Sequence, residues 1–212
     1  MACAICQDRR PRRFCPGVRG EICSLCCGAE REVSVACPLD CEFLREARRH
    51  EKSVQRSADE FPNRDIHVPE ALLEANEQLL TFLSMTIFRT AMQVSGVVDG
   101  DVLEALDGLI RTYRSLQSGI YYESRPNNPL AGSIYGTVQD ALAEYRKAEL
   151  ESLDLTKTRD ADILGLLVFL QRYALNCDNG RRRGRAFLDA LRELQPSAPE
   201  PSGSPPSSIV LR

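Results

Sequence analysis

Residues 3–41 read CAICQDRRPRRFCPGVRGEICSLCCGAEREVSVACPLDC, and they hold eight of the nine cysteines of this 212-residue chain. Few large apolar side chains accompany these cysteines, so the segment has too small a hydrophobic core to fold unaided. Disulfides or metal–thiolate bonds can replace such a core in a small domain. The chemistry of the eight thiols therefore decides how the N-terminal part of the chain folds.

The start of the chain and its apolar runs indicate where the protein resides. No apolar run follows a basic start, so we expect no secretory signal peptide. The longest apolar run, residues 163–170, has eight residues, whereas a membrane-spanning helix needs about 20. We therefore expect a cytoplasmic protein that does not enter a membrane. A reducing cytoplasm favours metal ligation over disulfides, and a net charge of −3 names no partner.

The spacing of the first cysteines favours zinc ligation. Cys3 and Cys6 are separated by two residues, and a tight turn can present such a pair to one metal ion. A closed tetrahedral zinc site has four ligands, so a second pair has to come from elsewhere in the sequence. Cys23 and Cys27 are four residues apart and would lie on one face of a helical turn.

Cys37 and Cys41 repeat this four-residue spacing. Pro38 suits the first position of a helix, so we expect a helix that begins there and continues over residues 42–53. The start of that helix would present both thiolates as half of a second site. His50 lies nine residues beyond Cys41, about 13.5 Å along the same helix, so it is not an expected ligand.

Eight cysteines suffice for two four-thiolate centres, and the predicted cofactor is Zn²⁺ with two ions per chain. The predicted ligands are Cys3, Cys6, Cys15, Cys23, Cys26, Cys27, Cys37 and Cys41. An iron–sulfur cluster or a thiol redox role is the alternative, although the cysteine run of ferredoxins is absent. His67 falls in an expected linker, and Cys177 is expected to be an ordinary buried thiol.

Three motifs in this segment resemble a known family. They are Cys3-x2-Cys6, Phe14-Cys15-Pro16 and Ile22-Cys23-Ser24-Leu25-Cys26-Cys27. They are similar to the CxxC, YxCPxC and YCSxxC motifs of the HIT and MYND zinc fingers. The resemblance covers residues 3–27 of the cysteine-rich segment 3–41 and none of the helical remainder. It implies two zinc ions held by interleaved pairs of ligands in a protein–protein interaction module.

The resemblance also implies how the cysteines divide between the two ions. The first set would be Cys3, Cys6, Cys23 and Cys27. The family's fourth ligand falls at Val18, which cannot bind metal, and its final His/Cys pair is replaced by two cysteines at a longer spacing. The second set would then be Cys15, Cys26, Cys37 and Cys41. An exchange of Cys26 and Cys27 between the two sets stays open.

The rest of the chain has apolar residues at helical spacing. The expected helices are one after Pro69 that ends at Gly96, one from a capping box of Asp101 and Glu104 to Pro126, one that starts near Pro129, one over residues 160–176 and one over residues 185–194. The predicted fold class is mainly α, a small Cys-rich head followed by an antiparallel helical bundle. The expected domains are the head at 1–57, a linker at 58–69, the bundle at 70–195 and a disordered Pro/Ser-rich tail at 196–212.

No catalytic constellation accompanies the cysteines. GxSxG, P-loop and GxGxxG motifs are absent, and the chain has only two histidines. We therefore expect a non-catalytic zinc-binding adaptor or regulator whose partner is another protein. The sequence makes no prediction of its oligomeric state. Residues 119–129, GIYYESRPNNP, are candidates for a partner contact or for the closed end of the bundle.

Two arginine clusters support nucleic-acid binding as the alternative function. The clusters are Arg9, Arg10, Arg12 and Arg13, and Arg181, Arg182, Arg183 and Arg185. Arginines in such clusters can contact phosphates. Eight thiolates would bring their own negative charge, however, so the first cluster is expected chiefly to screen them.

Overall fold

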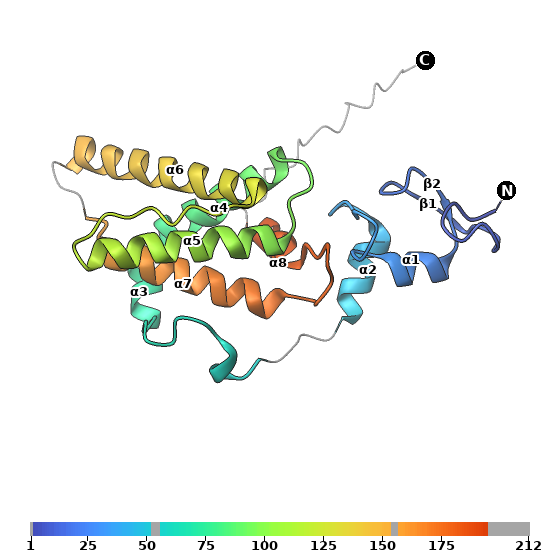
Figure 1. Ribbon diagram of the computed structural model, residues 1–212, viewed down its shortest axis with the longest axis horizontal. Helices are drawn as coiled ribbons and strands as arrows, with labels where there is room; N and C mark the ends of the chain where they lie inside the picture. The colour runs from blue at the N-terminus through green and yellow to red at the C-terminus, as the bar shows by residue number, and fades with distance from the viewer. Residues whose placement is uncertain (1, 52–55, 154–156, 195–212) are drawn as a thin grey trace, which may run out of the picture.

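The chain folds into a small N-terminal head, residues 2–51, and a larger helical body, residues 56–194, which lie at opposite ends of the molecule (Figure 1). The computed structural model describes residues 2–51, 56–153 and 157–194. These ranges contain eight α-helices, one short 3-10 helix and one two-stranded sheet. The predicted class, mainly α with a Cys-rich head that precedes the helices, is therefore confirmed. The expected tail and the end of the expected head helix, residues 52–53, lie outside the described ranges.

The head consists of a β-hairpin and two short helices. β1 (Arg13–Cys15) pairs antiparallel with β2 (Gly20–Ile22), and they are followed by α1 (Ser24–Glu30) and α2 (Glu42–His50). The hairpin turn packs against the segment before α2, where a Cβ on Gly17 would lie 2.7 Å from the carbonyl oxygen of Ala36. Strands of three residues are too short to show an alternating pattern, so the hairpin has no signal in the sequence.

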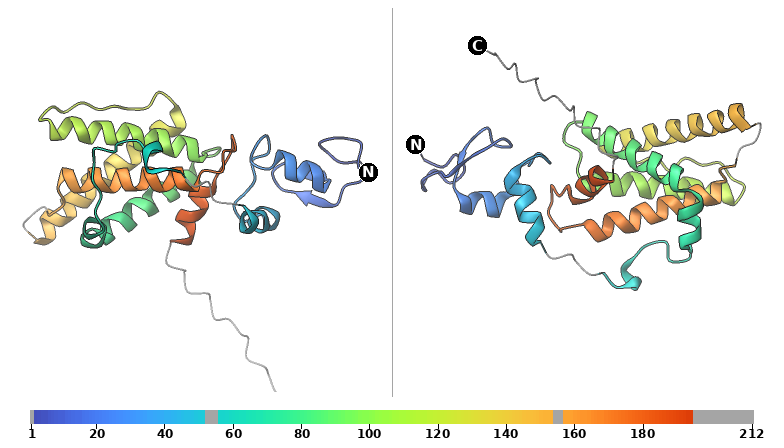
Figure 2. Two further views of the ribbon diagram at one scale, coloured as in Figure 1. Left: turned by 90° about the horizontal axis from the view of Figure 1, so that it is seen from below. Right: turned by 180° about the vertical axis from the view of Figure 1, so that it is seen from behind.

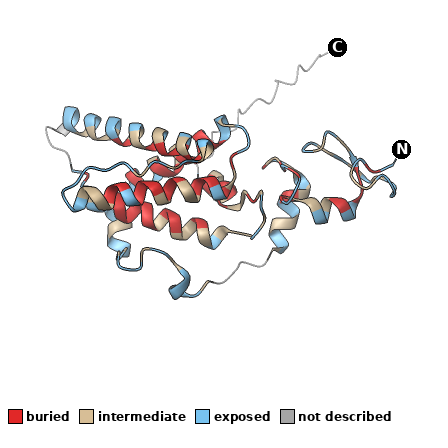
Figure 3. Ribbon diagram, in the orientation of Figure 1, coloured by how far each residue is buried: buried red, intermediate tan, exposed pale blue. Residues whose placement is uncertain are grey.

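The body contains six α-helices and the 3-10 helix Ala58–Glu60. The α-helices are α3 (Glu70–Ala75), α4 (Glu77–Gln93), α5 (Asp99–Gln117), α6 (Pro129–Leu153), α7 (Asp160–Cys177) and α8 (Ala186–Glu193). α5 lies between α6 and α7, and the buried faces of these helices turn toward one another (Figure 3). The apolar residues of α5 from Val102 to Tyr113 are buried or partly buried. No helix in the described ranges is long and apolar enough to cross a membrane.

The returning segment 118–128 sets the direction of α6. α7 is antiparallel to both α5 and α6, but α5 and α6 run in the same direction because this segment passes back along α5 (Figures 1 and 2). Asn128, just before α6, donates a hydrogen bond to Asp101 in the first turn of α5 (2.7 Å). Further along both helices, the hydroxyls of Tyr135 and Thr112 lie 2.9 Å apart.

Several helix boundaries differ from the expected ones. The expected first helix is two helices, because Asn76 leaves helical geometry (φ −122°, ψ 26°) and its side chain donates to the carbonyl of Leu72 (2.9 Å). α4 then ends at Gln93, short of Gly96. The expected helices at 160–176 and 185–194 are confirmed as α7 and α8, each within one residue at either end.

The expected capping box at the start of α5 is wrong. The helix begins two residues earlier, at Asp99, and Asp101 accepts the backbone N–H of Val98 (2.9 Å) from the third helical position. The helix also ends before Pro126. Gly119 adopts φ +80° and closes it after Gln117, and Ile120, just beyond the helix, is 64% exposed.

Gly108 lets the returning segment pass directly over α5. A Cβ at this position would lie 2.6 Å from the carbonyl oxygen of Ser124. We expect Gly108→Ala to lower the free energy of unfolding, measured by urea denaturation, by about 1–3 kcal/mol. Gly100→Ala is the control, because a Cβ there meets no atom within 4 Å. Equal stability of the two variants would contradict the close approach.

Candidate metal centre

Four cysteines of the head form a compact group. Cys3, Cys6, Cys23 and Cys26 place their sulfur atoms within 4.8 Å of one another. In the described part of the chain no other set of histidine, cysteine, aspartate or glutamate side chains is grouped as closely. A zinc ion with Zn–S bonds of about 2.3 Å requires sulfur–sulfur distances of about 3.8 Å, so these side chains fit a tetrahedral metal ion. We call this group the first metal centre.

Two short backbone segments position these ligands. Cys3 and Cys6 flank a turn in which the N–H of Gln7 donates to the carbonyl of Cys3 (2.8 Å). Cys23 is the N-cap of α1, and its sulfur accepts the N–H of Cys26 (3.4 Å). The two segments are joined by the N–H of Cys23, which donates to the sulfur of Cys3 (3.2 Å). These N–H···S bonds are the kind that stabilise thiolates.

The thiols of Cys3 and Cys26 differ in their affinity for a proton. Burial opposes the Cys3 thiolate, but the backbone N–H groups of Cys6, Cys23 and Ile5 outweigh it and lower the Cys3 pKa to about 6. The hydrogen bond to Cys23, together with burial, raises the Cys26 pKa to about 12. Thiols this close cannot all ionise unless a cation joins them. A metal ion that binds all four as thiolates supplies that charge.

The division of cysteines implied by the family resemblance needs a correction. Cys26, and not Cys27, joins Cys3, Cys6 and Cys23. Cys23 is the N-cap of α1, so its sulfur accepts the backbone N–H of the third helical residue, Cys26. This brings Cys26 to the first centre. The N–H of Cys27 bonds to the Cys23 carbonyl instead (3.0 Å). The sequence left open whether Cys26 and Cys27 exchange places between the two sets. In the first centre the structure has the exchanged arrangement, with Cys26.

The remaining four head cysteines meet around a second position. Cys15, Cys27, Cys37 and Cys41 all line a cavity of about 20 Å³ between the hairpin, α1 and the start of α2. We call them the second cysteine set. Unlike the sulfur atoms of the first metal centre, their sulfur atoms do not all lie within 4.8 Å of one another. Burial, followed by the charges of Glu32, Cys15 and Cys41, raises the Cys37 pKa.

The expected helical turn that carries Cys37 and Cys41 is wrong. α2 begins at Glu42 with Cys41 as its N-cap, while Pro38 lies in a preceding turn whose carbonyl accepts the Cys41 N–H (3.1 Å). The turn brings Cys37 and Cys41 to the same cavity without a helix. His50 lies on an exposed face of α2 beside Glu46, outside both groups.

Two arginines of the first cluster lie against the cysteines. Arg13 stacks on the ring of Phe43 (3.9 Å to its centre) and points a guanidinium nitrogen at the sulfur of Cys27 (3.9 Å). A hydrogen bond with Cys23 and the charge of Cys6 raise the Arg9 pKa. Both arginines are therefore placed to screen thiolates, as expected from the sequence.

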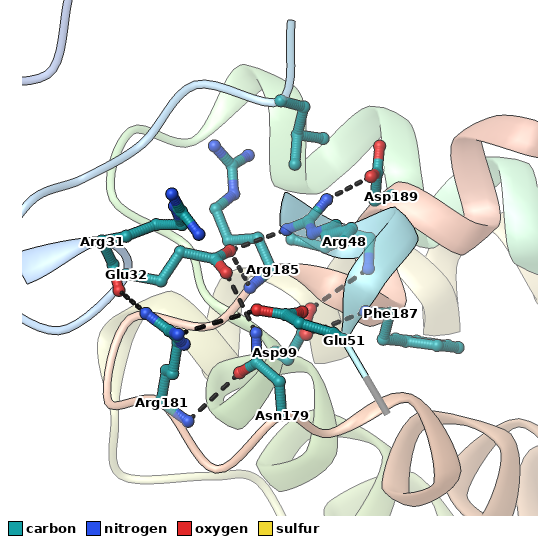
Figure 4. Close-up of polar contacts among 12 residues, drawn as sticks. Arg31, Glu32, Arg48, Glu51, Asp99, Asn179, Arg181, Arg185, Phe187 and Asp189 are labelled. Atoms are coloured by element: carbon teal, nitrogen blue, oxygen red, sulfur yellow. Dashed lines mark hydrogen bonds and ion pairs between the residues drawn. The ribbon is translucent and has the colours of Figure 1, made fainter. Parts of the chain in front are cut away.

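The second arginine cluster lies where the head meets the body (Figure 4). Arg181 donates to the backbone carbonyl of Arg31 in the head (2.6 Å), and the backbone N–H of Arg185 donates to Glu32 (3.0 Å). Asp99 accepts the N–H of Phe187 (2.8 Å) and so fixes the start of α8 beside this loop. Much of the cluster therefore contributes to an internal contact.

The structure places the other candidate residues apart from the cysteines. Ile120, Tyr121 and Tyr122 in the returning segment are each 64–66% exposed. His67 is exposed, and Cys177 is half-buried at the end of α7, where burial raises its pKa to about 11. Glu32 is completely buried, and no motif in the sequence around it predicts this burial.

No family model matches the chain, and neither the curated proteins nor the solved structures include a match.

Proposed function

We propose that the protein is a non-catalytic adaptor or regulator of the cytoplasm, in which structural zinc folds the head and another protein is the partner. The observation that carries this proposal is the first metal centre. Its four sulfur atoms would occupy all four positions of a tetrahedral zinc ion. A closed site of this kind has no position for water or substrate, so its contribution is to folding.

A second zinc ion would bind the second cysteine set. The four side chains line one small cavity, and Arg13 lies beside it to balance the charge of the thiolates. Along the chain, ligands of the two centres would alternate as two from the first, Cys15, two from the first, and then Cys27, Cys37 and Cys41. This interleaving supports the resemblance to the cross-braced HIT and MYND fingers.

The role in protein binding rests on that resemblance and on exposed side chains. The exposed residues Tyr121 and Tyr122 belong to a type that is enriched in protein interfaces. The nucleic-acid alternative loses support, because Arg181 is engaged inside the molecule. Arg182 and the exposed arginines of the first cluster are still accessible to phosphates. A salt-sensitive shift with DNA or RNA at low ionic strength would restore that alternative.

Native mass spectrometry of the purified chain, with an assay for labile sulfide, tests the zinc assignment. We expect two zinc ions per chain and no sulfide. One zinc ion per chain would contradict the second centre, and iron with sulfide would replace the proposal with an iron–sulfur protein. Turnover of a substrate that survives replacement of the cysteines, with the body still folded, would contradict a non-catalytic role.

A further inference from the structure

The contact between head and body comes from one part of the head. In the described ranges, every hydrogen bond and ion pair between residues 2–51 and the body involves residues 31–51. Residues 3–26, which carry the first metal centre, make none of these contacts. The docked arrangement therefore depends on the half of the head that carries Cys27, Cys37 and Cys41.

Glu32 is the centre of this contact (Figure 4). Its carboxylate accepts hydrogen bonds from Arg48 of α2 (2.7 Å), from the backbone N–H of Arg185 (3.0 Å) and from the side chain of Asn179 (3.0 Å). Its backbone carbonyl accepts the N–H of Arg183 (2.7 Å). The loop between α7 and α8 thus surrounds a side chain from the head, which is completely buried.

The backbone that presents Glu32 is held in an unusual conformation. Glu32 has φ +52°, a region that residues other than glycine rarely adopt. A tight turn maintains it, in which the N–H groups of Val33, Ser34 and Val35 all approach the carbonyl of Glu30 at 3.1–3.3 Å. This turn lies midway between Cys27 and Cys37, which both belong to the second cysteine set.

Two further contacts extend from the same set. Arg48 lies seven residues after Cys41 along α2, and it bridges Glu32 to Asp189 of α8. Leu39, between Cys37 and Cys41, is 6% exposed, belongs to the core of the body and accepts a hydrogen bond from Arg192 (3.1 Å). A metal ion that joins the four thiolates would therefore fix every segment that docks.

We propose that metal occupancy of the second cysteine set controls docking of the head onto the body. This inference rests on the second centre of the proposed function. With the metal bound, the chain between Cys27 and Cys41 is closed into short loops, and little entropy is lost when it docks. Without the metal, docking has to order these loops by itself, so the head separates and the donors around Glu32 become exposed.

Amide hydrogen exchange of the full-length chain, followed by NMR, tests the proposal with a matched pair of variants. Cys41→Ser removes a ligand of the second set, and Cys6→Ser removes a ligand of the first centre. The reporters of docking are the amides of Arg183 and Arg185, which donate to Glu32. The reporter of the first centre is the amide of Ala4, which donates to the carbonyl of Glu21.

We expect Cys41→Ser to accelerate exchange at Arg183 and Arg185 by at least about tenfold, with Ala4 unchanged. Cys6→Ser should accelerate exchange at Ala4 and leave the docking reporters protected. Cys15→Ser should reproduce the effect of Cys41→Ser, and it leaves the sequence from Cys27 onward intact. Protected amides in α5 and α7 verify that the body of each variant is folded.

Metal content, measured on the same samples, separates the two possible failures. If the wild-type chain binds two ions, Cys41→Ser loses one and the docking amides stay protected, the control of docking is contradicted while the proposed function stands. Equal loss of protection in Cys6→Ser would also contradict control by the second set. If Cys41→Ser keeps all the metal of the wild-type chain, the second centre itself is wrong and the inference is overturned with it.

Discussion

Replacing Glu32 with alanine is expected to separate the head from the body while the two proposed zinc ions stay bound. The substitution removes a completely buried carboxylate. Arg48, whose side chain is 12% exposed, then keeps only one of its two acidic partners, Asp189. The Asn179 side chain and the Arg185 N–H also lose their acceptor. Breaking a buried ion pair by removing one partner costs about 3–5 kcal/mol. A loss of this size favours separation of the head from the body.

Small-angle scattering measures the result as an increase in the radius of gyration, and native mass spectrometry verifies the metal content. Glu30→Ala is the matched control, because Glu30 lies in the same turn but its carboxylate, among the residues that the structure describes, meets only Ser34 in an exposed hydrogen bond. The control should stay as compact as the wild-type chain. If Glu32→Ala is equally compact, Glu32 is not the residue that holds the head on the body.

Paired cysteine substitutions are expected to reveal which ligands share a metal ion. Cys3→Ser combined with Cys26→Ser removes two ligands of the same centre, so the chain should lose one zinc ion and keep the other. Cys3→Ser combined with Cys27→Ser removes one ligand from each centre. Because a tetrahedral structural site needs all four ligands, this second variant should lose both ions.

The loss of a structural zinc ion has a large effect on the free energy of folding. Structural zinc contributes about 10–16 kcal/mol of apparent binding free energy in small zinc-binding peptides, which is also folding free energy. Native mass spectrometry reads the outcome directly as the number of ions per chain. The opposite result, with one ion kept in the Cys3/Cys27 variant and none in the Cys3/Cys26 variant, would restore the ligand set implied by the family resemblance.

The number and spacing of the cysteines predicted a metal-binding head, but not how its ligands divide. Cys26 and Cys27 are adjacent in sequence, and a four-residue spacing favours Cys27 as the partner of Cys23. The observed choice depends on where α1 begins, because Cys23 is its N-cap and Cys26 bonds back to it. A shift of one residue in a helix start is beyond what periodicity can locate.

The helices of the body could be predicted from the spacing of their apolar residues, but the direction in which they run could not. Apolar residues at helical spacing located α7 and α8 closely. The parallel course of α5 and α6 depends on Gly108 and Gly119, whose backbone roles become visible only when the returning segment is placed. Glu32 is a further case, since its burial depends on partners more than 140 residues away in sequence, such as Asn179.

X-ray absorption at the zinc edge of the native protein shows whether the metal centres are closed and made of cysteine sulfur alone. We expect four sulfur atoms around each zinc ion at about 2.3 Å and no nitrogen or oxygen ligand. A first shell that contains nitrogen or oxygen would mean an open or differently composed site. Absence of zinc, with iron in its place, would contradict the structural-zinc account altogether.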